Sequence, residues 1–198
     1  MQLYKYCIIS LFVFLFSSCS NQTKEQPHVV IVTELGNIEV ELYPQKAPKT
    51  VAAFLRFVDS GYYERSSFYR VLNNNNQPSD ANKTELIQGG IWKNGKKVKA
   101  SKVPHESTTS TGILHTNGTI SLARLEVGTA STEFFICIGK QPGLDYGGDN
   151  NADKQGYAAF GKVVKGMEIV IKISEKKIAN NILMNPFLFK TFVGYNLV

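Results

Sequence analysis

Short strand-like segments, spread along the whole chain, constrain the fold more than any other feature of the sequence. About eight segments rich in Val, Ile, Phe and Leu are separated by clusters of Gly, Pro, Asn and Asp. The first two, within residues 28–43, are predicted to form a hairpin that turns at Gly36-Asn37. We find no internal repeat or second domain. The pattern predicts a mostly β protein, a closed eight-stranded antiparallel barrel capped by two α-helices.

Local signals bound the two helices. Pro48 suits a first helical turn, and Gly61 suits the stop after a helix. The residues between them that repeat with helical period, and are expected to face the core, are Val51, Phe54, Leu55 and Val58. A second helix is expected over residues 166–173, and its inward-facing residues are expected to be Met167, Val170 and Ile171.

The first 18 residues have the pattern of an export signal. The apolar run IISLFVFLF is too short to span a bilayer as a mature helix. Ser17 and Ser18 then precede Cys19, as a cleavage site requires. The run FSSC resembles a bacterial lipoprotein signal, which implies that Cys19 is acylated and becomes the first mature residue. An ordinary signal peptide that is cut nearby is the alternative.

This interpretation divides the chain into a lipoprotein signal peptide over residues 1–18, a lipidated tether over 19–27 and a domain over 28–198. Several acyl chains would anchor the protein to a membrane without a transmembrane helix. We therefore expect a monomer in the cell envelope of a bacterium, facing the periplasm or the exterior. The lysine-rich loop over 93–102 is expected to be a solvated hairpin, with a contact to anionic lipid heads as the alternative.

Composition excludes several classes of function. The net charge of +6 comes without an arginine-rich run or aromatic-basic interleaving, so no nucleic-acid partner is expected. The three histidines lack metal-ligand spacing, and we expect no metal and no cofactor. Cys137 lies in the apolar run FFICIG and is expected to be an inert core thiol. Ser121 has no partner base nearby in the sequence, so nothing supports a hydrolase.

An arginine and a glutamine are predicted on neighbouring strands between Ser66 and Gly90. By the period of two, Phe68, Arg70 and Leu72 share one face of the first strand. An arginine on an apolar face needs a partner, or lies at an opening that a ligand can reach. Gln88 follows on the second strand. This hydrogen-bonding surface has no nucleophile, so it suits the binding of a peptide group better than its cleavage.

An ordered set of motifs resembles the cyclophilins, a family of peptidyl-prolyl cis-trans isomerases. The matching segments are TELGNIEVELYPQKAPKTVAAFL, SFYRV, LIQGG, NGTISLAR, STEFFI, GLD and GYAAFGKVVKGMEIV. Their order and spacing cover nearly the whole domain, and the match is weakest after Ile173. The resemblance implies a barrel of eight strands with two helices, in agreement with the strand pattern. It also implies isomerisation of X–Pro bonds in folding or exported proteins, with proline-containing polypeptides as partners.

The resemblance implies roles for individual residues. Arg70 matches the family's catalytic arginine, with a structural ion pair as the alternative role, and Gln88 matches the glutamine that positions the peptide. The other residues at substrate-binding positions are Tyr69, Leu86, Ala123, Glu133, Phe135, Leu144 and Tyr157.

Four residues depart from the family's pattern. Tyr69 replaces the histidine of the motif FHR, and Glu133 replaces a glutamine that usually hydrogen-bonds the arginine. An ionised Glu133 is expected to orient Arg70 and to compete for its charge. Glu85, or a residue shifted from it in the alignment, replaces a pocket phenylalanine after a loop about ten residues longer than usual. Gly143 replaces an aromatic residue that is important to cyclosporin binding, so cyclosporin is expected to inhibit the protein weakly.

Two alternatives to catalysis remain open from the sequence. The first is a cyclophilin-fold binding module or chaperone for proline peptides with little turnover. The second is a scaffold within a larger envelope complex, which would use the loop over 73–82 as its contact.

Overall fold

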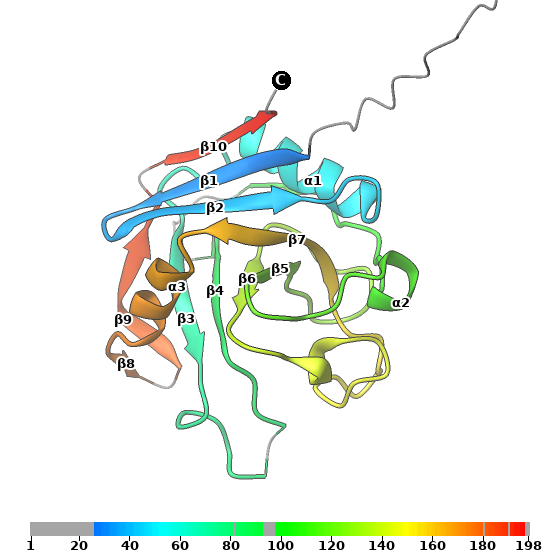
Figure 1. Cartoon of the computed structure of the whole chain (residues 1–198), viewed down its shortest axis with the longest axis vertical. Helices are drawn as coiled ribbons and strands as arrows, with labels where there is room; N and C mark the ends of the chain where they lie inside the picture. Colours follow the sequence, from blue (N-terminus) through cyan, green and yellow to red (C-terminus); the bar gives the residue numbers. More distant parts are fainter. Residues whose placement is uncertain (1–25, 81, 93–97, 180, 190, 197–198) are drawn as a thin grey trace, which may run out of the picture.

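Ten strands and three helices make up the described part of the protein. The computed structural model describes residues 26–80, 82–92, 98–179, 181–189 and 191–196, and Figure 1 shows their arrangement. The strands are β1 (Pro27–Thr33), β2 (Gly36–Leu42), β3 (Ser67–Leu72), β4 (Leu86–Gly90), β5 (Thr119–Leu122), β6 (Phe134–Cys137), β7 (Ala158–Lys165), β8 (Ile178–Ala179), β9 (Ile182–Leu188) and β10 (Thr191–Asn196). The helices are α1 (Pro48–Asp59), α2 (Thr108–Thr111) and α3 (Met167–Ser174), with a 3-10 turn η1 at Pro142–Leu144.

One antiparallel sheet contains all ten strands, in the order β10-β1-β2-β7-β5-β6-β4-β3-β9-β8. The predicted mostly β fold with two main helices is therefore confirmed. More strands are found than the expected eight, because the C-terminal segment divides into β9 and β10 and is preceded by the two-residue β8. β9 pairs with β3 and β10 pairs with β1, so this segment contacts both halves of the sheet. Closure of the barrel stays a prediction, since no ladder between described residues joins β10 to β8.

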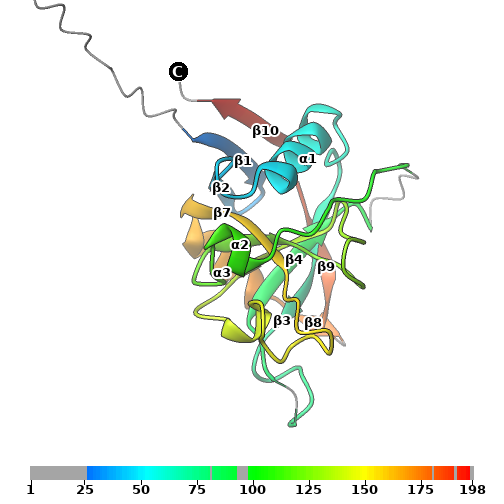
Figure 2. The ribbon, with the colours of Figure 1, turned by 90° about the vertical axis from the view of Figure 1, so that its right-hand side faces the viewer.

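Helix α1 covers one part of the core. Pro48 begins the helix, and Gly61 follows its end in the left-handed region at φ +65°, as predicted. Of the four residues expected to face the core, three are buried and Leu55 packs against the core while partly exposed. The ring of Phe54 contacts that of Phe134 edge-on, with 5.9 Å between centroids. Rings from α1 and β6 therefore fix the helix against the sheet. Figure 2 shows α1 beside β10, which it also contacts.

Helix α3 is rotated from its expected orientation. Its buried residues are Ile169, Val170 and Ile173, whereas Ile171 is 42% exposed, so the prediction that Ile171 faces inward is wrong. The helix begins after Gly166, whose backbone is in the left-handed region at φ +90° and lies against the carbonyl of Asn37. Only glycine fits this approach, and it sets which face of α3 meets β2.

The first hairpin turns earlier than expected. Glu34 and Leu35 form the turn, and Thr33 pairs with Gly36, which already belongs to β2. The Thr33 hydroxyl donates to the Gly36 carbonyl at 2.8 Å and accepts from the Leu35 N–H at 3.2 Å. A hydroxyl that bonds its own turn in this way competes with the Gly-Asn turn that the sequence suggests.

Several predictions concern residues outside the described part. The signal peptide and most of the tether, including Cys19, lie before residue 26, and β1 begins at Pro27. Half of the lysine-rich loop, residues 93–97, is likewise outside it. Among the described residues, none of the helices is long and apolar enough to cross a membrane.

The orientation of α3 predicts different costs for two neighbouring isoleucines. Ile173→Ala removes a fully buried side chain, so we expect a loss of about 2–5 kcal/mol in the free energy of unfolding. Ile171→Ala, the matched control on the same helix, should cost less than about 1 kcal/mol. Denaturant unfolding measures both. Equal costs would contradict this orientation of the helix.

Candidate active site

A β-bulge in β3 brings Arg70 into the candidate site. Phe68 pairs with Gly89 and Arg70 pairs with Gln88, so Tyr69 is an extra residue in β3. Two residues opposite one bend the strand and change which face the following side chains occupy. Phe68 is fully buried in the main core, whereas Arg70 lines a cavity on the other side. The prediction that Arg70 shares a face with Phe68 is therefore wrong.

Four side chains form a chain of hydrogen bonds along this face. Arg70 Nη1 donates to Gln88 Oε1 at 3.2 Å. The Gln88 amide nitrogen donates to the Tyr69 hydroxyl at 2.9 Å, and this hydroxyl donates to Glu133 Oε2 at 2.5 Å. Each member donates to the next, so the orientation of the Gln88 amide is determined by its neighbours. The structure thus brings together four of the residues that the sequence assigned to the site.

Glu133 is held by the backbone. Its Oε1 accepts from the N–H groups of Ile91 at 2.9 Å and Trp92 at 3.2 Å. A side chain at Gly90 would overlap with this carboxylate, which accounts for the glycine. Burial raises the pKa of Glu133 above its usual range, although the bond from Tyr69 and the two backbone N–H groups oppose the shift. The sequence suggested that Glu133 orients Arg70. In the structure it does not do so directly, because Tyr69 and the backbone engage its carboxylate.

Tyr69 is held as a neutral hydrogen-bond donor. Burial raises the pKa of its phenol well above the ordinary value, and the nearby carboxylate of Glu133 raises it further. The ring packs against the indole of Trp92, with 5.0 Å between centroids. Tyr69 stands where the family has a histidine and, because of this raised pKa, does not titrate near neutral pH.

Asn181 is a member of the site that sequence reasoning missed. Its Oδ1 accepts from Arg70 Nε at 3.1 Å, and its carbonyl accepts from the Val71 N–H at 2.9 Å. Asn181 lies between β8 and β9 in the left-handed region, at φ +60°. The sequence Asn-Asn between two short apolar runs indicates such a turn, but not its contact with β3. The two side-chain partners of Arg70 within the described part of the chain are thus neutral amides.

A cavity of about 540 Å³ opens beside Arg70 and Gln88. Its apolar floor is formed by Leu86, Phe135 and Leu144. With Cys137, these residues make up a small buried cluster that is separate from the main core. Ala123 and Tyr157 pack against this cluster and also line the cavity. Of the nine residues predicted at catalytic or substrate-binding positions, all line this cavity except Tyr69, which lies behind Gln88. Burial raises the pKa of Cys137, in agreement with an unreactive thiol.

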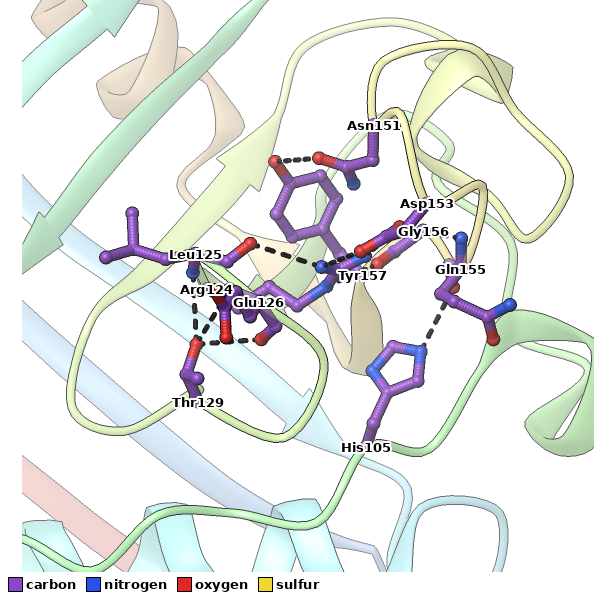
Figure 3. A network of polar contacts seen from close by, with 10 residues as sticks. All are labelled: His105, Arg124, Leu125, Glu126, Thr129, Asn151, Asp153, Gln155, Gly156 and Tyr157. Carbon is purple, nitrogen blue, oxygen red and sulfur yellow. Dashed lines mark hydrogen bonds and ion pairs between the residues drawn. The ribbon is translucent and has the colours of Figure 1, made fainter.

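A second arginine at the cavity has its charge fully matched (Figure 3). Arg124 Nη1 and Nη2 donate to the two carboxylate oxygens of Asp153 at 2.7 and 2.8 Å, and Nε donates to the Gly156 carbonyl at 2.8 Å. The guanidinium lies 5.3 Å from the ring centroid of Tyr157, whose hydroxyl donates to Asn151 Oδ1 at 3.1 Å. The pair with Arg124 lowers the pKa of Asp153 to about 2. This network fixes the ring that forms one wall of the cavity.

Two other departures from the family's pattern have structural outcomes. Glu85 is not among the residues that line the cavity, whereas its neighbours Thr84 and Leu86 line the wall there. Of the two alternatives, this favours the shifted alignment. The space above Gly143 is occupied by the amide of Asn150, which a side chain at 143 would displace. The pocket therefore differs from the family's pattern at 143 and keeps an apolar residue at 86.

Ser121 has a partner base that its sequence neighbourhood did not reveal. His115 Nε2 lies 3.1 Å from Ser121 Oγ, and His115 Nδ1 lies 2.7 Å from Asp145 Oδ1. Both Ser121 and His115 are buried, at 0% and 1% exposure, and the ring of His115 stacks on that of Phe135. A nucleophile must reach its substrate, so this buried trio gives no support to a hydrolase.

Comparisons with known proteins agree with this geometry. A model of the family described as cyclophilin type peptidyl-prolyl cis-trans isomerase/CLD matches residues 28–187. The chain belongs to the cyclophilin family.

Relatives with similar sequences extend over most of this cyclophilin. It is 39% identical over 154 residues to peptidyl-prolyl cis-trans isomerase A of Dickeya dadantii (strain 3937), across 77% of this chain and 74% of the relative. Peptidyl-prolyl cis-trans isomerase B of Escherichia coli (strain K12) is 34% identical over 146 residues, across 73% and 82%. The crystal structure of a Cryptosporidium parvum cyclophilin superposes with a TM-score of 0.68 at 21% identity, covering 88% of this chain and 99% of its own.

Opposite pKa shifts at two carboxylates of this cyclophilin predict opposite effects of pH. Glu133 has a folded pKa above its ordinary value of 4.5, so its contribution to stability is present below that value and is lost as pH rises through the folded pKa. Wild type should therefore lose stability relative to Glu133→Gln as pH rises from about 4 to about 7.

Asp153 is the control of opposite sign. Its pKa is lowered from 3.8 to about 2, so wild type should gain stability over Asp153→Asn as pH rises from about 2 to about 5. Melting temperatures of wild type and the two variants, measured from about pH 2 to about pH 7, report both trends. Parallel curves of melting temperature against pH for wild type and Glu133→Gln would show that the pKa of Glu133 is not raised.

Proposed function

We propose that the protein accelerates cis–trans isomerisation of X–Pro bonds in folding or exported polypeptides, with Arg70 as the catalytic residue. The observation that carries this proposal is the position of one arginine beside an apolar cavity. Among the described residues, Gln88 and Asn181 accept from two of the five guanidinium N–H groups of Arg70. Because both partners are neutral, the positive charge of Arg70 is available to a ligand in the cavity.

The reaction needs only a lower barrier to rotation. Partial double-bond character of the C–N bond sets this barrier at about 18–20 kcal/mol. X–Pro bonds therefore exchange over roughly tens to hundreds of seconds without a catalyst. A cation that donates to the prolyl nitrogen localises its lone pair and weakens the resonance. A reduction of about 4 kcal/mol accelerates exchange roughly a thousandfold, which one or two preorganised charged hydrogen bonds can supply.

The shape of the cavity suits a proline ring. Leu86, Phe135 and Leu144 provide an apolar floor that can hold the ring while the preceding residue turns. Gln88 lines the same cavity and can bind the peptide main chain. No step in this mechanism needs a base, a nucleophile or a cofactor, so the chemistry rests on residues of the chain itself.

Arg70→Ala tests the mechanism. We expect kcat/KM for a short Ala-Pro peptide to fall by roughly a hundred- to a thousandfold, because the charged donor is lost. Exchange spectroscopy by NMR measures this rate on an unlabelled peptide. Arg56→Ala, which removes an exposed arginine on α1, is the matched control and should keep full activity.

Two outcomes would change this assignment. Equal rates for wild type and Arg70→Ala would remove Arg70 from the mechanism. Binding of proline peptides by wild type without any acceleration of exchange would instead favour a cyclophilin-fold binding module or chaperone.

We further propose that the mature protein is a monomer anchored through acylated Cys19 in the cell envelope of a bacterium, facing the periplasm or the exterior. The support is the order of sequence features before the domain: an apolar run, two small residues and a cysteine, then a polar tether that ends where β1 begins. A tether of this length would hold the domain close to the membrane surface.

Metabolic labelling with an alkyne-bearing fatty acid tests the anchor. Wild type should be labelled, whereas Cys19→Ser should not, because the serine lacks the thiol that carries the first acyl chain. Cys137→Ala is the control, since this thiol is buried in the domain and the variant should be labelled like wild type. Two results would favour an ordinary signal peptide. One is fatty-acid label in Cys19→Ser; the other is an unlabelled wild type that mass spectrometry shows to be cleaved at another position.

A further inference from the structure

The cavity beside Arg70 has a polar end as well as an apolar floor. Five polar residues of its lining form this end, and they come from two loops, the β3–β4 loop over 73–85 and the loop over 141–157 that follows β6. These residues are Gln77, Asn82, Thr84, Asp149 and Asn150. The side chains of Gln77, Asn82, Thr84 and Asn150 form hydrogen bonds, and the carboxylate of Asp149 pairs with Lys154. A proline ring needs no such partners, so this part of the cavity is not explained by the proposed reaction alone.

Hydrogen bonds join the two loops across this polar end. Asn150 Nδ2 donates to the Asn82 carbonyl at 2.8 Å and to Thr84 Oγ1 at 2.5 Å. Asn82 Nδ2 donates in return to the Asp149 carbonyl at 3.3 Å. The partners are 66 to 68 residues apart in the chain. The wall is therefore built by tertiary structure, not by the local sequence of either loop.

The β3–β4 loop is also braced from within. Asn76 Oδ1 accepts from the Asn73 N–H, and Asn76 Nδ2 donates to the Val71 carbonyl. The Gln77 amide donates to the carbonyls of Asn73 and Thr84 and accepts from the Thr84 N–H. Side-chain amides thus satisfy the backbone of a loop that has no regular structure. A loop held in this way presents its remaining polar groups in a fixed arrangement, which lowers the entropy cost of binding.

We propose that this polar end is a second subsite, which binds an Asn, Gln, Ser or Thr side chain close to the proline of a client polypeptide. The proposal rests on the isomerase function, since the proline must occupy the apolar floor. The side-chain oxygens of Asn82 and Asn150 accept no hydrogen bond from the described residues, so they can accept one from the client. Asp149 pairs with Lys154 at 3.2 Å in an exposed position and adds little charge to the subsite.

The subsite is expected to disfavour apolar client side chains, because they cannot form hydrogen bonds with its amide groups. A Leu side chain placed here would cover amide groups without bonding them, and an unbonded polar group that is removed from water weakens binding. A Gln side chain can bond those groups instead. One hydrogen bond of ordinary strength corresponds to about a five- to tenfold preference for Gln over Leu.

A pair of peptides tests the subsite. Each contains one Ala-Pro bond, and the peptides differ only in carrying Gln or Leu two residues before and two residues after the proline. Affinity is measured by NMR titration, and exchange is measured on the same samples. Wild type should bind the Gln peptide about five- to tenfold more tightly. In Asn150→Ala and in Asn82→Ala the ratio of affinities should fall below about twofold.

Matched variants separate binding from folding. Asn75→Ala removes an exposed side chain of the same loop that does not line the cavity, and it should keep the wild-type ratio. If Asn150→Ala fails to fold, the exposed Asn82→Ala still decides the outcome. Equal affinity of wild type for the two peptides, or an unchanged ratio in both variants, overturns the subsite. A preference for Gln without any acceleration of exchange supports the subsite and counts against the isomerase.

Discussion

The extra residue in β3 is the constraint on which the site depends. A regular strand would point Arg70 to the same side as Phe68, into the aromatic core, where an unmatched guanidinium is very costly. The bulge between these two positions turns Arg70 outward and also places Tyr69 behind Gln88. Because of the bulge, one short strand places the ring of Phe68 in the core and the guanidinium of Arg70 at the cavity.

The two arginines at the cavity differ in how their charges are balanced. Arg124 is almost fully buried, and the carboxylate of Asp153 binds it through both oxygens, so its role is to fix a wall. The carboxylate nearest to Arg70 in its network is Glu133, and two neutral side chains, Gln88 and Tyr69, separate them. A direct pair would have matched the charge that the proposed reaction needs. The replacement of glutamine by Glu133 is therefore compatible with a catalytic Arg70.

Local patterns in the sequence predict the elements of this fold better than their orientation. Turn residues and apolar periods located α1, β1 and most strands, and the ordered motifs located the residues of the pocket. Strand alternation could not reveal the bulge at Tyr69, because an inserted residue leaves no mark on the pattern of Val and Phe around it. The exposure of Ile171 was likewise hidden, since the approach of Gly166 to Asn37 sets the orientation of α3. Partners such as Asn181 depend on contacts between segments far apart in the chain.

The long β3–β4 loop and the glycine at 143 are two parts of one arrangement. A side chain at Gly143 would displace the amide of Asn150, and that amide is the link to Asn82 and Thr84. The small residue at 143 thus makes room for Asn150, and Asn150 gives the longer loop a fixed position over the cavity. Restoring a large side chain at 143 alone would break this link, and shortening the loop alone would leave the Asn150 amide without its acceptors. The two features therefore constrain each other, and any change in one is expected to require a change in the other.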